Sequence, residues 1–189
     1  SWCVEDLIEM KISIITICMD LDSQLLENFE SIDEQDYSNY EHLVKYGGSD
    51  RSKFRRFRDR FSSDRRLFVQ KPDKGLYDAL NQALEMVTGD IIGILHSDDR
   101  FTSFSSLSLV AENWTKSTDC LYGDLAYYSK DMASLRRVWK SQPFSTSLLK
   151  FGFMPPHPAF YVSKKIIDDV GYYNDDFDIS GDYDWMLRI

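Results

Sequence analysis

The chain has 189 residues, of which 43% are hydrophobic and 14% aromatic, and it carries a net charge of −9. This length and apolar content suffice for one folded domain with a sizeable core, and they exclude a disordered chain. The acidic balance does not favour a nucleic-acid partner, and no run approaches the roughly 18 apolar residues of a membrane-spanning helix.

The cysteines and the N-terminal stretch bear on the compartment. Cys3, Cys18 and Cys120 form no C-x-x-C pair and leave an odd count, which favours reduced thiols. The first residues are acidic and short of apolar side chains, unlike a signal peptide. We therefore expect a cytoplasmic protein, with residues 1–10 as an N-terminal extension and residues 11–189 as one domain.

The first half of the chain alternates between strand-like and helix-like segments. Short β-branched or apolar runs predict strands, and apolar residues spaced three and four apart predict helices. In chain order we expect a strand over 12–18, a helix over 25–32, a strand over 41–46, a largely helical basic segment over 51–66, a strand over 67–70, a helix over 76–87 and a strand over 90–95. This order is typical of an α/β fold with a mostly parallel central sheet and helices on both faces.

The second half is less regular. We expect a strand over 121–128, a proline-rich loop before a strand over 159–162, a helix over 164–171 and a last helix over 182–188. A helix of about eight residues is marginal by itself, so we expect the domain to be truncated at its C-terminal end.

The predicted strand over 90–95 leads directly into two carboxylates, Asp98 and Asp99. Ligands of open α/β sheets bind outside the carboxyl ends of the strands. Two hard oxygen ligands there suit Mg²⁺ or Mn²⁺ shared with a substrate phosphate. For this pair alone, a loop with two solvated acids is the alternative.

Several further motifs occur around this pair in a fixed order. In chain order the set is Ser13-Ile14-Ile15-Thr16, Tyr46-Gly47-Gly48-Ser49, residues 73–81 (DKGLYDALN), residues 88–93 (TGDIIG), residues 95–99 (LHSDD), Tyr122-Gly123-Asp124, residues 156–160 (PHPAF) and Asp182-Tyr183-Asp184. Together they resemble the family 2 glycosyltransferases of GT-A fold, especially the bacterial polysaccharide-assembly type. The resemblance covers residues 11–189.

This resemblance implies an inverting, metal-dependent glycosyltransferase. It would move a sugar from a nucleotide-diphosphate donor, with a UDP-sugar favoured, to a saccharide or lipid-linked acceptor of the bacterial cell envelope. Mn²⁺ or Mg²⁺ would be bound by Asp99, with Asp98 nearer the metal or the ribose. By the same resemblance Asp182 would be the general base. A helix cannot point both Asp182 and Asp184 at one target, so one of them would face the site and the other would be solvated or paired.

The same resemblance implies a donor-binding set. Its members are Thr16 at the end of the first strand, Tyr46, Gly47, Gly48 and Ser49 around the base and ribose, Asp73, Lys74 and Gly75 on the nucleotide side, and Asp98. The family usually has Asp where this chain has Tyr46. A tyrosine can stack or donate a hydrogen bond but cannot accept one as a carboxylate does, which leaves the nucleotide base open.

Other residues keep two interpretations each. His157 and Asp124 are candidates for the acceptor or sugar side, but a structural loop histidine and a turn-holding aspartate are the alternatives. The basic segment over 51–66 predicts a solvated helix face. It also leaves peripheral membrane contact open, because each basic residue near anionic lipid gains about 1 kcal/mol.

Two other classes of function remain. A nucleotidyltransferase of related topology would carry a glycine-rich, basic phosphate loop after the first strand, where residues 18–22 (CMDLD) are acidic instead. A non-catalytic nucleotide- or sugar-binding module is the second alternative. The joint presence of Asp98, Asp99 and Asp182 favours the enzyme.

Overall fold

The computed structural model describes residues 10–129, 131–149 and 151–189. The predicted extension over 1–10 therefore lies outside the described residues, apart from Met10. In the part of the chain that the structure describes, no helix has the length and apolar character needed to cross a membrane.

The elements alternate as the sequence predicts through the first four strands. Their bounds are β1 (Ile12–Cys18), α1 (Ser23–Asp33), β2 (Tyr40–Tyr46), α2 (Arg51–Phe61), β3 (Arg66–Gln70), α3 (Leu76–Leu84), β4 (Ile91–Ile94), α4 (Ser106–Glu112), β5 (Cys120–Tyr122), β6 (Leu125–Tyr128), β7 (Leu135–Trp139), α5 (Thr146–Leu149), a 3-10 turn η1 (His157–Ala159), β8 (Phe160–Ser163), α6 (Lys164–Val170) and α7 (Gly181–Arg188).

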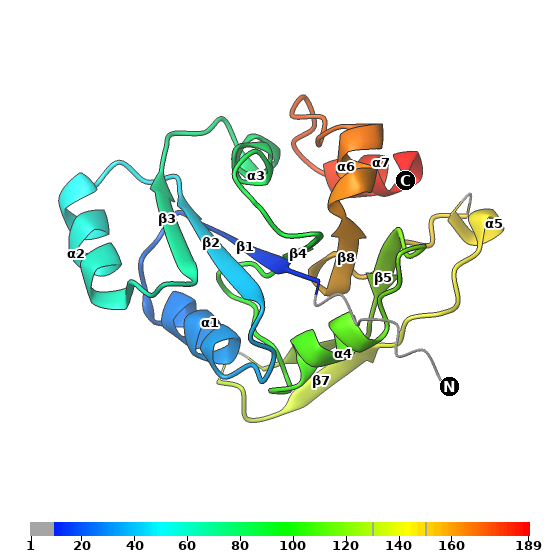
Figure 1. Ribbon diagram of the computed structural model, residues 1–189, viewed down its shortest axis with the longest axis horizontal. Helices are drawn as coiled ribbons and strands as arrows, with labels where there is room; N and C mark the ends of the chain where they lie inside the picture. Colours follow the sequence, from blue (N-terminus) through cyan, green and yellow to red (C-terminus); the bar gives the residue numbers. More distant parts are fainter. Residues whose placement is uncertain (1–9, 130, 150) are drawn as a thin grey trace, which may run out of the picture.

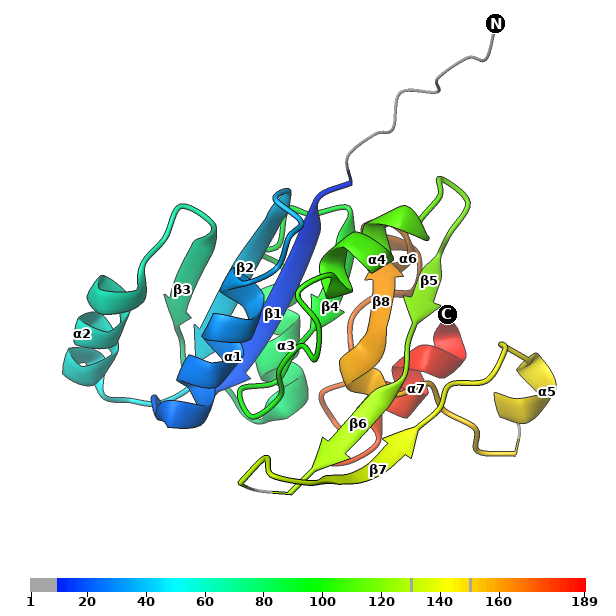
Figure 2. The ribbon, with the colours of Figure 1, turned by 90° about the horizontal axis from the view of Figure 1, so that it is seen from below.

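The central sheet has the strand order β3-β2-β1-β4-β8-β5. β1 to β4 are mutually parallel, whereas β8 runs antiparallel to both β4 and β5. The carboxyl ends of β1 to β4 therefore share one edge, which we call the carboxyl edge. β6 and β7 form a separate hairpin on that side of the sheet (Figure 2).

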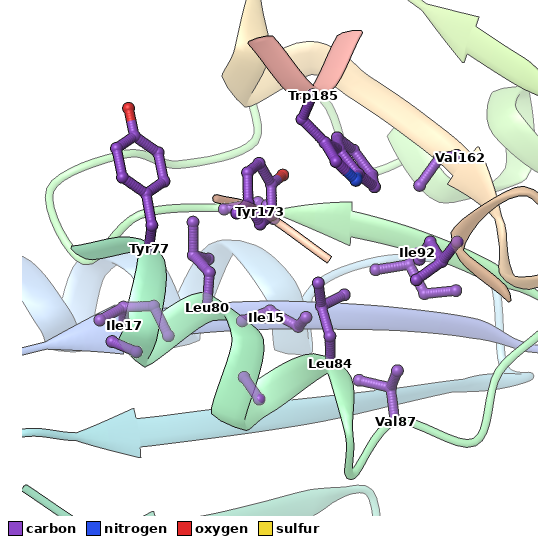
Figure 3. Close-up of a cluster of buried hydrophobic side chains, with 14 of the residues drawn as sticks. Ile15, Ile17, Tyr77, Leu80, Leu84, Val87, Ile92, Val162, Tyr173 and Trp185 are labelled. Carbon is purple, nitrogen blue, oxygen red and sulfur yellow. The ribbon is translucent and has the colours of Figure 1, made fainter. Parts of the chain in front are cut away.

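Helices cover both faces of this sheet (Figure 1). Every side chain of β1 is buried, as expected for a strand packed on both faces. One face packs against α3, α6 and α7, where Ile15, Leu80 and Trp185 share one apolar cluster (Figure 3). The other face packs against α1, α2 and α4 in two further clusters.

The second half departs from the prediction in several respects, since α4, β7 and α5 were not predicted. The expected strand over 121–128 is wrong, because the chain leaves the sheet between β5 and β6. Gly123 N–H still donates to the Ala159 carbonyl at 3.0 Å, whereas the Asp124 carboxylate accepts from Ser141 N–H at 2.8 Å. Residue 123 therefore still bonds to the segment beside β8, whereas residue 124 already bonds to the segment that follows β7. The chain passes from the central sheet to the β6–β7 hairpin at this point.

Candidate active site

The two adjacent carboxylates lie in a tight turn at the carboxyl edge. After β4, the Asp99 N–H donates to the His96 carbonyl at 2.9 Å, which closes the turn. Asp98 is exposed and Asp99 is half-buried. Burial, together with the charge of Asp98, raises the pKa of Asp99 to about 6. We call residues 95–99 the acidic loop.

Asn28 of α1 binds the backbone of the acidic loop through its side chain. Its buried side-chain amide donates to the carbonyls of His96 and Asp99, both at 2.9 Å, and approaches the Leu95 carbonyl at 3.4 Å. Ser31 and Gln35, also buried, continue this polar stripe one and two turns along. Ser31 accepts from Phe101 N–H, and Gln35 bonds the Ser103 carbonyl and Leu107 N–H.

The sequence interpretation missed this stripe, although a signal for it exists. Asn28 and Ser31 lie one turn apart in α1 and are buried together with the apolar Leu25 and Ile32, and position 35 continues the i, i+3, i+7 spacing two residues past the end of the helix. Polar residues at such positions must find buried partners. The partners here are backbone groups of the segment that begins with the acidic loop.

A pocket of about 330 Å³ opens beside the acidic loop. Its lining consists of Gln24, Glu27, Asn28, Asp98, Asp99, Arg100, Asp131 and Met132. The last two come from the tip of the β6–β7 hairpin, which therefore closes one side. Arg100 pairs with Glu27 at 3.1 Å, and no described cation pairs with Asp98 or Asp99.

The acidic loop could supply part of the ligand set of a divalent cation. The described residues hold no group of three or more His, Cys, Asp or Glu side chains that could bind a metal alone. Two hard carboxylates, one of them half-buried, match cations such as Mg²⁺, which often take one or two carboxylates and complete their shell with substrate phosphate oxygens. Asp98 and Asp99 could hold such an ion together with a diphosphate.

Asp182 stands at the start of α7 and is bonded to α3. Its Oδ1 accepts from the Tyr77 hydroxyl at 3.3 Å, and the same hydroxyl accepts from Gly181 N–H at 2.8 Å. Asp184, two residues on, pairs instead with Arg188 at 3.3 Å. The structure thus separates the two carboxylates of the late acidic motif, as the helix argument predicted.

His96 of the acidic loop lies beside His157, and the charge of Asp182 acts on both imidazoles. Their rings stack with centroids 5.8 Å apart, and His157 Nε2 is 3.1 Å from the Tyr173 hydroxyl. Burial lowers the pKa of His96, on which the charges of both Asp98 and Asp182 act. Burial and His96 lower the pKa of His157 to about 4. Both imidazoles are therefore neutral at pH 7.

The end of β2 forms a tight corner around a buried ion pair. Lys45, whose side chain is fully buried, pairs with Asp73 in the loop before α3. A Cβ on Gly47 would collide with the Asp73 carboxylate, so glycine is required for this approach. Lys45 was not among the predicted site residues, and Asp73, predicted on the nucleotide side, already has this cation as its partner.

Tyr46 occupies the other face of the same corner. Its ring is buried and stacks on Phe54 of α2, with centroids 5.4 Å apart. A Cβ on Gly48 would collide with the Tyr46 hydroxyl end. Ser49 is exposed at the start of the turn into α2. The predicted roles of these residues in nucleotide binding stay predictions.

Thr16 requires a correction. It lies within β1, not at its end, and its side chain is fully buried. The Thr16 hydroxyl donates to the Leu95 carbonyl at 2.9 Å and faces Asn28. Thr16 therefore supports the acidic loop from inside the fold and does not border an open nucleotide site.

The remaining predicted residues lie around the same edge. Lys74 and Gly75 are exposed before α3, and Gly75 has a φ of 151°, a value that favours glycine. His157 is buried beside Tyr173, which leaves it close to Asp182. Asp124 is exposed and holds Ser141 N–H, in agreement with the turn-holding alternative.

The known proteins that this chain resembles in sequence are glycosyltransferases. Residues 13–173 match glycosyl transferase family 2. An uncharacterized glycosyltransferase of Mycobacterium tuberculosis is 30% identical over 190 residues, covering 94% of this chain and 68% of the relative. A PGL/p-HBAD biosynthesis glycosyltransferase of Mycobacterium bovis is 26% identical over 127 residues, 66% of this chain and 47% of the relative.

Solved structures agree on the fold. A mannosyltransferase of Pyrobaculum calidifontis in complex with GDP-Man and Mn²⁺ has a TM-score of 0.63 at 17% identity, covering 87% of this chain and 48% of that one. S. aureus TarS in complex with UDP-GlcNAc has a TM-score of 0.65 at 14% identity, covering 95% and 53%. The fold is GT-A, and the chain spans about half the length of these two proteins.

Proposed function

The chain belongs to glycosyl transferase family 2, and from that premise we propose that it transfers a sugar, with inversion, from a nucleotide-diphosphate donor to a saccharide or lipid-linked acceptor. The observation that carries the proposal is the meeting of two acidic groups at one edge. Asp98 and Asp99 follow β4 and Asp182 begins α7, yet His96 of the acidic loop stacks on His157 with centroids 5.8 Å apart, and the charge of Asp182 acts on both imidazoles.

The two groups suit different parts of the transfer. Asp98 and Asp99 would bind Mn²⁺ or Mg²⁺ together with the donor diphosphate, and the bound ion would supply charge neutralisation of the leaving group. Asp182 would take the proton of the acceptor hydroxyl, because its Oδ2 has no partner among the described residues. Attack from the side opposite the diphosphate inverts the anomeric carbon.

Nucleotide binding tests the proposed site for the donor and its metal ion. We would titrate UDP, GDP and dTDP into the protein by calorimetry, with and without Mn²⁺, and repeat the titration with Asp99→Ala. The proposal predicts tight binding of one nucleotide only with Mn²⁺, and loss of that binding in the variant. Equal binding by Asp99→Ala and the wild type would show that the metal assignment is wrong. Absence of binding in a folded sample would favour a non-catalytic module.

The nucleotide itself is part of the proposal. GDP-Man is bound in one structural neighbour and UDP-GlcNAc in another, so both are suitable donor probes. Tyr46 presents no carboxylate to a base, which leaves a uracil-containing donor favoured only by the family resemblance. The three-nucleotide titration answers this question directly.

We also propose contact with the cytoplasmic face of an anionic membrane through α2. Its outer side carries six exposed basic residues, Arg51, Lys53, Arg55, Arg56, Arg58 and Arg60, and one exposed acid, Asp59. Phe54, Phe57 and Phe61 pack on the inner side. A lipid-linked acceptor would be met at such a surface, and near anionic lipid each basic residue gains about 1 kcal/mol.

Vesicle sedimentation tests this surface. The protein should bind phosphatidylcholine vesicles that contain phosphatidylglycerol and not those without it. The double variant R55E/R56E should bind at least about tenfold more weakly. K116E/K165E makes the same change in net charge at exposed positions outside α2 and should bind as the wild type does. Equal losses in both double variants would contradict a specific α2 contact.

A further inference from the structure

The N-terminus of α7 lacks a cap of its own. The residue before the helix, Ser180, has a φ of 67°, and its side chain makes no capping hydrogen bond. The first helical N–H groups need acceptors from elsewhere. Gly181 N–H finds one in the hydroxyl of Tyr77, which is 104 residues earlier and belongs to α3.

The direction of both hydrogen bonds of this hydroxyl follows from the groups involved. An N–H can only donate, so the Tyr77 oxygen accepts from Gly181 at 2.8 Å. The single hydroxyl proton is then free for the Asp182 carboxylate, whose Oδ1 lies 3.3 Å away. Burial raises the pKa of Tyr77, so the hydroxyl keeps its proton at neutral pH.

The Tyr77 ring is held on two sides. A Cβ on residue 181 would lie 2.8 Å from the ring carbons, so Gly181 allows the close approach. The ring also stacks on Tyr173, with centroids 5.7 Å apart. Figure 3 shows Tyr77 at the start of α3, near Tyr173 and with its hydroxyl pointing away from the sheet.

We propose that Tyr77 is a positioning residue for Asp182: its hydroxyl binds one carboxylate oxygen and the adjoining helix end, and so leaves Oδ2 as the oxygen that meets the acceptor hydroxyl. The inference rests on the proposed function, in which Asp182 is the base. Gly181 is its steric counterpart, because any larger residue displaces the ring.

Tyr77→Phe removes the hydroxyl and keeps the ring. The assay is release of nucleotide from GDP-mannose or UDP-N-acetylglucosamine with Mn²⁺, with water as the acceptor, beside calorimetric binding of GDP or UDP. We expect kcat to fall about 10- to 100-fold, the loss typical of a misplaced catalytic group. Donor KM and nucleotide Kd should stay within about twofold, because the donor half is untouched.

Tyr183→Phe is the matched control. Tyr183 lies next to Asp182, but its hydroxyl donates to the Leu149 carbonyl at 2.6 Å, away from the carboxylate. It should keep the wild-type kcat. A kcat for Tyr77→Phe equal to that of Tyr183→Phe would overturn the inference, and so would parallel losses of kcat and donor affinity.

Two more variants separate the inference from its premise. Gly181→Ala keeps the hydroxyl but displaces the ring, so it should reproduce the kcat loss even where Tyr77→Phe fails to fold; a wild-type kcat in Gly181→Ala would overturn the inference. Asp182→Asn tests the base itself. Activity in Asp182→Asn would refute the proposed function, whereas an inactive Asp182→Asn beside a fully active Tyr77→Phe would refute the positioning role alone.

Discussion

The carboxyl edge of the central sheet differs from the opposite edge, where β1 to β4 begin and which we call the amino edge. The difference lies in the partners of their carboxylates. At the amino edge, Glu41 pairs with Lys11 at 2.7 Å and accepts further bonds from Ser13 and from the N–H and hydroxyl of Thr88. At the carboxyl edge, no described residue forms an ion pair with Asp98 or Asp99. Glu41 therefore has a cation and hydrogen-bond donors as partners, whereas Asp98 and Asp99 have no cation among the described residues.

The pKa values express this difference. Burial would raise the pKa of Glu41, but its hydrogen bonds outweigh burial and hold it at about 2. For Asp99, burial and the charge of Asp98 act in the same direction and raise the pKa to about 6. Carboxylates with partners stabilise the fold, whereas those without partners cost stability until a cation binds.

The largest expected effect is at the carboxyl edge, in Asp182→Asn. Loss of the base should reduce nucleotide release from GDP-mannose or UDP-N-acetylglucosamine by about a thousandfold, within the range for general-base removal. Nucleotide affinity should be unchanged by calorimetry, because Asp182 has no part in the donor half. Asp184→Asn is the control, since Asp184 pairs with Arg188 and should retain activity.

A second prediction concerns the buried ion pair of Lys45 and Asp73 near that edge. Lys45→Met leaves Asp73 charged, only 10% exposed and without its partner. We expect a loss of about 3 kcal/mol in the free energy of unfolding, measured with urea. K45M/D73N removes both charges and should recover most of that loss. A double variant no more stable than Lys45→Met would show that the ion pair is not the cause.

A third prediction concerns the support of the acidic loop. Asn28→Ala removes the side-chain donor from the partly buried carbonyls of His96 and Asp99 and should cost about 2 kcal/mol of stability. It should also weaken Mn²⁺-dependent nucleotide binding about tenfold, as loss of outer-shell support does. Gln35→Ala, from the same stripe but bonded to Ser103 and Leu107, should lose stability and keep its affinity. Equal affinity in both variants would contradict the supporting role.

The smallest effect is expected at the amino edge, where the acid is partly exposed and screened by water. Glu41→Gln should lower the free energy of unfolding by about 1 kcal/mol at pH 7. Because the pKa of Glu41 is depressed from 4.5 to about 2, its contribution is present above pH 4.5 and is lost as the pH falls toward 2. Urea unfolding of both proteins across this range should show the two curves converging. A difference that persists at low pH would exclude the carboxylate charge as its source.

Much of this arrangement could be predicted from the sequence, because it depends on local patterns. β1 and α6 follow the predicted ranges within a residue, since buried β-branched runs and a serine cap with a terminal glycine are local signals. The β6–β7 hairpin could not be foreseen. Most of its side chains are exposed or only half-buried, so no strong apolar alternation marks it.

The site residues also fall into two groups, those that local sequence patterns reveal and those that only the fold brings together. The acidic loop and Asp182 are visible in the sequence as short acidic motifs. Lys45 is not, because its position in an apolar strand gives no hint of a partner 28 residues away. Tyr77 lies within the motif over 73–81, but its bond to Asp182 spans 105 residues and depends on how α3 and α7 pack. Contacts between residues so far apart in the sequence can be identified only once the fold is known.

The contrast between the two edges is tested most directly by the unfolding free energies of Asp99→Asn and Glu41→Gln, measured side by side at neutral pH in a chelator. We expect opposite signs: Asp99→Asn should be more stable than the wild type, because a half-buried charge without a cation is removed, and Glu41→Gln should be less stable. Loss of stability in both variants would contradict it, since Asp99 would then hold the fold together as Glu41 does.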